Sequence, residues 1–268
     1  MHCERRPLAS LSVIVITKNE AHNIEACLQS VSFAQQIVVL DSGSSDDTVA
    51  LSQKAGAEVS VRLDWQGFGV QKNRALALAV EDWVLSIDAD ERLTPDLQAE
   101  IQRVLKNPAY EIYDFPRQSS YCGQYMQYSG WYPDRVIRLF KRGAAAFSDR
   151  LVHEKVLTSK TVGRLDSALL HESYRSLESV LDKVNRYSSA GAQLLKNKGS
   201  TASPGKALAH ASWAFFRTYV LRRGFLDGRM GLVLAISNAE ETYYRYLKLW
   251  LMLQYGTTPP MAQVGSSK

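Results

Sequence analysis

Short runs of β-branched and aliphatic residues alternate with helix-like segments through the first hundred residues of the chain. Runs of this kind, bounded by polar residues, are typical of buried strands, and they are expected at 12–17, 37–40, 58–62 and 83–87. Helical spacing or helix-start signals follow each strand, at 20–31, 49–55, 70–80 and 95–105. This alternation predicts an α/β fold in which helices flank a mostly parallel central sheet.

The pattern changes twice in the second half of the chain. Two further strands are expected at 112–116 and 136–140 and a helix at 177–195, and the Gly-, Ser- and Pro-containing stretch 197–205 is typical of a linker. We therefore expect a catalytic domain at 1–196, with a nucleotide-binding half at about 10–107 and an acceptor half at about 108–196. A helical appendage at 205–256 and a disordered tail at 257–268 complete the expected organisation.

The composition fits an ordinary globular protein: 46% of its 268 residues are hydrophobic, 22% are charged, and the formal net charge is +5. Its three cysteines are scattered and lack metal-site spacing, which favours a reducing compartment. No apolar run approaches the roughly 20 residues of a membrane span. We expect a cytoplasmic protein, and nothing in the sequence indicates nucleic acid as a partner.

Three acids and a base follow the fourth expected strand in the stretch VLSIDADERL, residues 84–93. Like charges this close repel one another unless positive charge lies among them. In an extended segment Asp88 and Asp90 point to the same side, and two oxygen donors on one face suit Mg²⁺ or Mn²⁺. The alternative is a turn with solvated acids before a helix that Thr94 caps.

Polar segments also end two other expected strands, as TKNE (17–20) and DSGSSDDT (41–48). Because ligands of parallel sheets bind at the carboxyl ends of the strands, all three segments are expected to face one crevice. The sequence contains neither GxGxxG after the first strand nor GxxxxGK[ST]. Their absence counts against a dinucleotide oxidoreductase and a P-loop NTPase.

Several blocks, taken in order, resemble a family 2 glycosyltransferase of the GT-A fold, whose DxD motif the DAD run resembles. The blocks are TKNE, DSGSSDDT, WQGFGVQKNRAL (65–76) and DADER (88–92). Further blocks resemble the bacterial lipopolysaccharide-core enzymes that add glucose β-1,4 to the first inner-core heptose. These are YSGWYPDRVIRLFKR (128–142), RLVHEKV (150–156), LLHESY (169–174) and RRGFLDGRMGL (222–232).

The resemblance implies a metal-assisted, inverting transfer of a hexose, with glucose favoured, from a UDP-sugar to an inner-core heptose. The residues implied to bind the nucleotide sugar are Thr17, Asn19, Glu20, Asp41, Ser42, Lys72, Arg74, Asp88, Ala89 and Asp90. The implied metal ligands are Asp90, Asp88 and His171. Purely structural roles stay open for several of these residues. Asn19 could cap a helix, the 41–48 segment could serve only as a turn, and Lys72 and Arg74 could lie on a solvated helix face.

An inverting transfer needs a carboxylate to take the proton from the acceptor hydroxyl. Two residues are candidates. Glu154 is favoured because many family members carry their acidic base at that place, and Asp134 is kept because it lies beside aromatic residues that could stack on a sugar. The alternatives are a salt bridge for Glu154 and a turn position after Pro133 for Asp134. Arg135 and Arg138 could face phosphate or acidic acceptor groups, and Arg138 is favoured to alternate out of its strand.

The segment 205–256 holds seven Lys or Arg against three acids, and ten of the chain's 26 aromatic residues. Basic amphipathic helices with interfacial aromatics are typical of contact with an anionic membrane surface. The alternatives are ordinary core helices or a dimer interface, so a homo-oligomer stays open.

These features lead us to expect an enzyme peripheral on the inner face of the inner membrane, with a lipopolysaccharide inner-core acceptor. Two rival functions remain. One is a polyprenyl-phosphate sugar transferase of the same fold, and the other is a non-catalytic module that binds a sugar nucleotide or a membrane.

Overall fold

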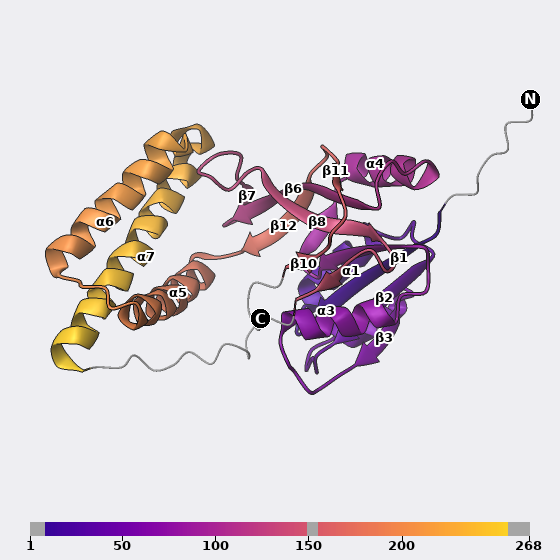
Figure 1. Cartoon of the computed structure of the whole chain (residues 1–268), viewed down its shortest axis with the longest axis horizontal. Coiled ribbons are helices and arrows are strands. Elements are labelled where there is room, and N and C mark those ends of the chain that lie inside the picture. Colours follow the sequence, from indigo (N-terminus) through magenta and orange to yellow (C-terminus); the bar gives the residue numbers. More distant parts are fainter. Residues whose placement is uncertain (1–8, 149–154, 257–268) are drawn as a thin grey trace, which may run out of the picture. The chain divides into compact units, whose positions relative to one another are not determined.

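The computed structural model describes residues 9–148 and 155–256 and divides into two compact units (Figure 1). Unit 1 comprises the described parts of Met1–Arg117 and Asp134–His171. Unit 2 comprises Gln118–Pro133 and the described part of Glu172–Ser266. Each unit is considered by itself below.

The parallel part of the sheet in unit 1 consists of the first four strands of the chain. They are β1 (Leu11–Thr17), β2 (Gln36–Asp41), β3 (Glu58–Val61) and β4 (Trp83–Asp88). Their order across the sheet is β3-β2-β1-β4, so β1 lies between β2 and β4. Figure 1 labels β1, β2 and β3. Both ends of each of these four strands lie within one residue of the ends expected from the sequence.

Mostly antiparallel strands extend this sheet on the β4 side, in the order β4-β8-β6-β12-β5. The bounds are β5 (Glu91–Leu93), β6 (Ile112–Tyr121), β8 (Asp134–Lys141) and β12 (Leu169–Tyr174). Short strands complete the fold: β7 (Gln124–Tyr125), β9 (Ala146–Phe147), β10 (Val156–Leu157) and β11 (Val162–Arg164). The pairing of β6 with β8 shifts register between Tyr113 and Asp114.

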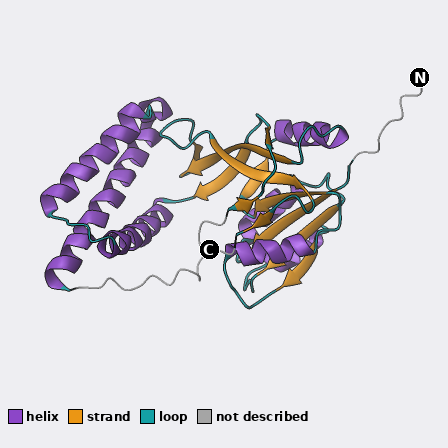
Figure 2. Ribbon diagram, in the orientation of Figure 1, coloured by secondary structure: helices purple, strands orange, loops and turns teal. Residues whose placement is uncertain are grey.

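Helices cover both faces of the parallel strands, because successive side chains of a strand point to opposite faces. Val13 and Val15 lie in the same apolar cluster as buried residues of α1 (Ala21–Gln29) and α4 (Pro95–Lys106). Ile14 lies in a second cluster with Ala75 of α3 (Phe68–Ala77). A fourth helix, α2, spans Thr48–Lys54. The predicted fold class, an α/β sheet flanked by helices, is confirmed (Figure 2).

Local capping explains where two of these helices begin. Thr94 Oγ1 accepts a hydrogen bond from the Leu97 N–H at 3.2 Å, and Pro95 occupies the first turn of α4, as expected. Asn19, a possible cap of α1, does not cap it, since Glu20 is the N-cap residue and its side chain makes no capping hydrogen bond. Asn19 has a φ of 55°, a left-handed conformation that Asn tolerates, and its amide oxygen accepts from the Ser45 N–H instead.

Unit 2 is dominated by three long helices (Figure 2): α5 (Leu177–Asn197), α6 (Pro204–Phe216) and α7 (Gly228–Tyr255). Ser176 and Ser203 cap α5 and α6, each accepting a bond from a backbone N–H three residues later. A π-helical turn, η1 (Arg217–Leu221), and a 3₁₀ turn, η2 (Gly224–Asp227), connect α6 to α7. None of the helices in the described part of the chain is long and apolar enough to cross a membrane.

Candidate active site

The ends of three parallel strands bring the predicted polar segments to one edge of the sheet. Thr17, the last residue of β1, pairs with Asp41 of β2, and Ile16 pairs with Asp88 at the end of β4. Because the three strands run parallel, their carboxyl ends meet at this edge. The edge therefore collects side chains from the 17–20, 41–48 and 88–92 segments, as the sequence predicted.

Asp88 is held between two buried basic side chains. Its Oδ1 lies 2.9 Å from Lys72 Nζ of α3, and its Oδ2 accepts a bond of 2.6 Å from Arg138 of β8. Only 3% of the Lys72 side chain and 8% of the Arg138 side chain are exposed. The positive charge that the acidic cluster requires is therefore supplied here by two residues of the protein itself.

Glu91, the first residue of β5, lies at the centre of a wider charge network. The residue has no exposed surface, its Oε2 accepts from the Asp88 N–H at 2.8 Å, and its Oε1 accepts from Arg138 at 2.6 Å. Arg117 of β6 lies 3.4 Å from the same oxygen and also pairs with Asp134 at 2.6 Å. Charges of alternating sign thus run from Lys72 to Asp134, which makes a buried acidic cluster tolerable.

The network shifts the pKa values of Asp88 and Arg138 in opposite directions. Burial alone would raise the pKa of the Asp88 carboxyl, but Arg138 and Lys72 hold it well below its ordinary value. Burial alone would lower the pKa of Arg138, but Asp88 and Glu91 raise it. Asp88 is therefore ionised and Arg138 is charged throughout the physiological range of pH.

Asp90 and His171 form a further pair near this network. Asp90 Oδ2 lies 3.4 Å from His171 Nε2, and the two side chains are 12% and 14% exposed. Pairing of β12 with β5 brings them together, since His171 is opposite Glu91 in the ladder. Among the described residues, no group of three or more His, Cys, Asp and Glu side chains forms a metal cluster. The pair offers one carboxylate and one imidazole to a cation that keeps water or phosphate as its other ligands.

The 41–48 segment folds around the Asp41 side chain. Asp41 Oδ1 accepts from the Gly43 and Ser44 N–H groups, both at 2.8 Å, and Oδ2 bonds the Ser44 hydroxyl at 2.5 Å. Ser42, which is also buried, accepts a bond of 3.0 Å from Gln71 of α3. Gly43 has a φ of 88°, and a side chain there would lie 2.8 Å from Leu63. Asp41 thus builds the loop, and the turn chemistry considered for it is present.

Residues of the 17–20 segment meet this loop. The Asn19 and Glu20 N–H groups donate to Ser44 Oγ and Thr48 Oγ1, each at 2.8 Å. The Thr17 hydroxyl is buried at the end of β1 and has no hydrogen-bond partner within the described part of the chain. A buried polar atom left unsatisfied in this way is a place where a ligand's polar group would fit.

The two basic residues predicted on α3 have different surroundings. Lys72 is buried at Asp88, whereas Arg74 pairs with the exposed Asp64 at 2.6 Å and contacts Gln71. The solvated-face alternative thus describes the position of Arg74 and not that of Lys72. Ala89 is buried between Asp88 and Asp90. The structure therefore brings Lys72, Asp88, Asp90 and His171 to the same region, whereas Arg74 is linked to the 41–48 loop only through Gln71, which donates to Ser42.

The structure describes only one of the two candidate bases, Asp134. The Asp134 carboxylate accepts two bonds from Arg117, at 2.6 and 3.0 Å, and so already has a strong partner. Glu154 lies outside the described residues. The expectation that Arg138 alternates out of its strand is wrong, because its side chain points into the acidic cluster. Glu91 and Arg117 are members of the site to which sequence reasoning gave no role.

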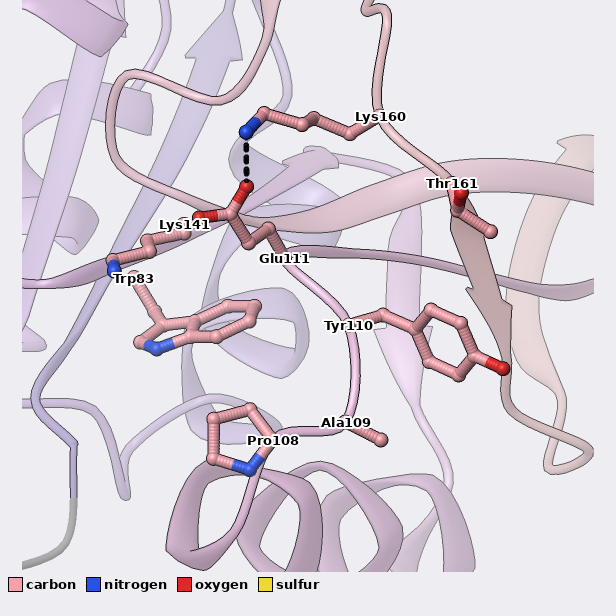
Figure 3. Close-up of a pocket in the computed structure, with 8 residues that line it drawn as sticks. All are labelled: Trp83, Pro108, Ala109, Tyr110, Glu111, Lys141, Lys160 and Thr161. Atoms are coloured by element: carbon pink, nitrogen blue, oxygen red, sulfur yellow. Dashed lines mark ion pairs between the residues drawn. The ribbon is translucent and has the colours of Figure 1, made fainter.

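A surface pocket of about 490 Å³ lies at the other end of β4, where that strand begins with Trp83 (Figure 3). Its wall includes the exposed ion pair between Glu111 and Lys160, 2.7 Å apart, and the aromatic ring of Tyr110. β4 is six residues long, so this pocket is roughly 17 Å from the acidic cluster at about 3.3 Å per residue. It is distinct from the candidate active site.

Comparison with known proteins places these features in a class. The model of the family Glycosyl transferase family 2 matches residues 12–156, which include the three polar strand ends. A glycosyltransferase of Rickettsia conorii, described as uncharacterized, is 32% identical over 257 residues, covering 89% of each chain. The fold, the charged strand ends and these matches define an enzyme that transfers glycosyl groups. The chain belongs to glycosyl transferase family 2.

Two further similarities are more distant. The lipopolysaccharide core biosynthesis glycosyltransferase LpsC of Rhizobium meliloti is 28% identical over 258 residues, covering 90% of this chain and 94% of that protein. The crystal structure of S. aureus TarS 1–349 in complex with UDP-GlcNAc aligns over 92% of both chains, with 14% identity and a TM-score of 0.48.

Proposed function

We propose that this enzyme transfers a hexose, with glucose favoured, from a UDP-sugar to a heptose of the lipopolysaccharide inner core, with inversion at the anomeric carbon. Family membership supports glycosyl transfer, and the similarity to LpsC supports a lipopolysaccharide core acceptor. The UDP-sugar donor and the inversion at the anomeric carbon are implied by the resemblance of the TKNE, DSGSSDDT, WQGFGVQKNRAL and DADER blocks to family 2 glycosyltransferases. A single observation carries the proposal: the Asp90–His171 pair lies beside the Lys72–Asp88–Arg138 cluster at the carboxyl edge of the sheet.

Different residues at this edge would bind different parts of the donor. Thr17, with its unsatisfied buried hydroxyl, and the Asn19–Glu20 segment would line the nucleoside pocket together with the loop that Asp41 and Ser42 build. Lys72 lies where its charge would oppose that of a diphosphate, while Asp88 keeps it in place. Arg74 would reach the nucleotide only after leaving Asp64.

The chemistry of Asp90 and His171 fits a divalent cation. Carboxylate oxygen suits Mg²⁺ and Mn²⁺ alike, whereas an imidazole nitrogen favours the transition metal, so we expect Mn²⁺ to support activity better than Mg²⁺. When bound, such a cation supplies positive charge against the leaving diphosphate. Asp88, already neutralised by two basic residues, would contact ribose or stabilise the turn more readily than it would ligate the cation.

Glu154 would take the proton from the acceptor hydroxyl as that oxygen attacks the anomeric carbon from the face opposite UDP. Asp134 is the second candidate, and it would first have to loosen its pairing with Arg117. Substitution separates the two. We expect Glu154→Gln to lower turnover by about 10²–10⁴-fold, the usual contribution of a general base, and Asp134→Asn to lower it much less. The reverse order would transfer the role to Asp134.

The decisive experiment measures UDP release and product mass with UDP-glucose, UDP-galactose and UDP-GlcNAc as donors. The acceptors are lipopolysaccharides truncated at the inner-core heptose, lipopolysaccharides lacking heptose, and polyprenyl phosphate. We expect a hexose to be added only to the heptose-bearing acceptor. Addition to polyprenyl phosphate would replace this function with the rival one, and absence of transfer with every pair would overturn the proposal.

The cation assignment is tested in the same assay with Mn²⁺, Mg²⁺ or EDTA. We expect Asp90→Asn and His171→Asn to lower turnover at least about 100-fold, because each removes a ligand of the charge that stabilises the leaving group. The matched control is Asp96→Asn, which changes an exposed carboxylate in the first turn of α4. Full activity of Asp90→Asn in EDTA would refute the cation site.

A further inference from the structure

The turn between α6 and α7 exposes large apolar side chains on every segment that builds it. We call residues 213–236 the hairpin tip; it includes the end of α6, the turns η1 and η2 and the first two turns of α7. Each of its prominent apolar side chains is between 39% and 56% exposed: Trp213, Phe216, Val220, Leu221, Phe225, Leu226, Leu232 and Ile236. Such a density of exposed apolar surface in one short segment is typical of an interaction site.

All the exposed charged residues of the hairpin tip are basic. Its four basic residues are exposed: Arg217, Arg222, Arg223 and Arg229. Its single acid, Asp227, is only 6% exposed and accepts bonds from the Gln127 and Tyr128 N–H groups and from the Ser129 hydroxyl. The exposed surface of the tip is therefore cationic and apolar and carries no carboxylate.

The tip is also held in a defined conformation. Besides the bonds to Asp227, the Ser129 N–H donates to the Arg222 carbonyl at 2.9 Å. The backbones of η2 and α7 touch, since a side chain at Gly231 would lie 1.8 Å from the Gly224 carbonyl oxygen. Because these contacts order the tip in advance, its exposed side chains lose less conformational freedom when they bind.

We propose that the hairpin tip docks on an anionic phospholipid surface. Arginines would contact lipid phosphates while Trp213, Phe216 and Phe225 enter the boundary between head groups and acyl chains, a position that aromatic side chains favour. Each basic residue near such a surface adds to the attraction, and no exposed acid of the tip opposes it. This inference goes beyond the proposed function and does not depend on it.

Charge also argues against a second copy of this chain as the occupant. In a symmetric dimer the same patch of both copies meets itself, so eight arginines would face one another without an exposed carboxylate between them. An anionic bilayer offers the opposite charge and an apolar interior together. The lipid surface is therefore the partner that the chemistry of the tip fits best.

Cosedimentation of the full chain with vesicles tests the proposal. Vesicles of phosphatidylglycerol and phosphatidylethanolamine should bind the protein at least tenfold more tightly than vesicles of phosphatidylcholine alone. Two variants, Arg217→Glu/Arg223→Glu and Phe225→Ser/Leu226→Ser, should each lose at least tenfold in affinity for the anionic vesicles. The control Arg103→Glu/Lys106→Glu makes the same charge change on exposed positions of α4 and should keep its affinity.

Circular dichroism and UDP binding, measured without vesicles, show whether the variants fold and keep their donor site, so that failure of this proposal is distinguishable from failure of the proposed function. Light scattering follows the oligomeric state. Equal binding of tip variants and parent chain would overturn the proposal. Equal binding to both vesicle types, or a dimer that the tip variants dissociate, would do so as well.

Discussion

Glu91 is the residue on which the charge network of the site depends. Its carboxylate is fully buried and meets Arg138, Arg117 and the Asp88 N–H together. Replacing it with Gln keeps the shape and an acceptor oxygen but removes the negative charge between two guanidinium groups. We expect Glu91→Gln to lower the free energy of unfolding by about 3–5 kcal/mol, the usual cost of breaking a buried ion pair.

The matched control for this substitution is Glu111→Gln. Glu111 also forms an ion pair, with Lys160, but both side chains are about half exposed, at 42% and 52%. Exposed pairs contribute about 0–1 kcal/mol, so this variant should unfold almost as the parent chain does. Urea unfolding of both variants measures the difference. Equal losses would mean that burial does not make the Glu91 network special.

At the scale of residues, the sequence predicted that the acidic cluster needs positive charge but not which residue supplies it. Lys72 was assigned to the nucleotide, and Arg138 was expected to alternate out of its strand. Arg135 pairs with Asp114, whereas Arg138 lies where the pairing of β8 with β6 shifts register, between Ile137 and Leu139, so simple alternation does not fix the direction of its side chain. Which face meets Asp88 depends on the pairing of β8 with β4, a long-range contact that periodicity does not contain.

At the scale of elements, the local signals predicted the first half of the chain well. The first four strands and the helices between them follow from β-branched runs, helical spacing and the Thr94–Pro95 start of α4. The second half was harder, because β6 continues past Pro116 to Tyr121 and the short strands β7, β9, β10 and β11 lack a clear period. The turns η1 and η2 break an apparently continuous helical pattern for reasons of packing at Gly224 and Gly231.

Asp227 is the residue through which η2 holds the 127–129 segment. Its buried carboxylate accepts from two backbone N–H groups and from the Ser129 hydroxyl. Asp227→Ala leaves these donors without an acceptor, so we expect the free energy of unfolding to fall by about 3 kcal/mol.

Thermal and urea unfolding of this variant give the measurement. The control Asp182→Ala removes an exposed carboxylate of α5 in the same unit and should change stability by no more than about 0.5 kcal/mol. If both variants unfold alike, the η2 segment owes its conformation to its apolar packing and not to Asp227.

At the scale of the whole molecule, the two proposals assign different ligands to the two compact units. Hydrogen exchange of the full chain, followed by mass spectrometry, tests this assignment. UDP with Mn²⁺ should slow exchange in peptides covering 41–48 and 86–92 of unit 1. Anionic vesicles should slow exchange in peptides covering 213–236 of unit 2.

Vesicles of phosphatidylcholine are the control and should leave both sets of peptides unchanged. Protection of 41–48 by lipid alone, or of 213–236 by UDP alone, would contradict the division of ligands between the units. The net charge of +5 does not say where the exposed basic residues lie, whereas the structure shows four exposed arginines within the hairpin tip.

The arginine-rich, apolar hairpin tip has a consequence for how this enzyme can evolve. A fluid bilayer responds to the total charge and apolar area that face it and not to the order of the residues. Exchanges among the exposed arginines and exposed large apolar residues of 213–236 should therefore be tolerated as long as the balance is kept and Gly224, Asp227 and Gly231 remain. The Asp88–Glu91 stretch has no such latitude, because each of its three carboxylates contacts a particular neighbour.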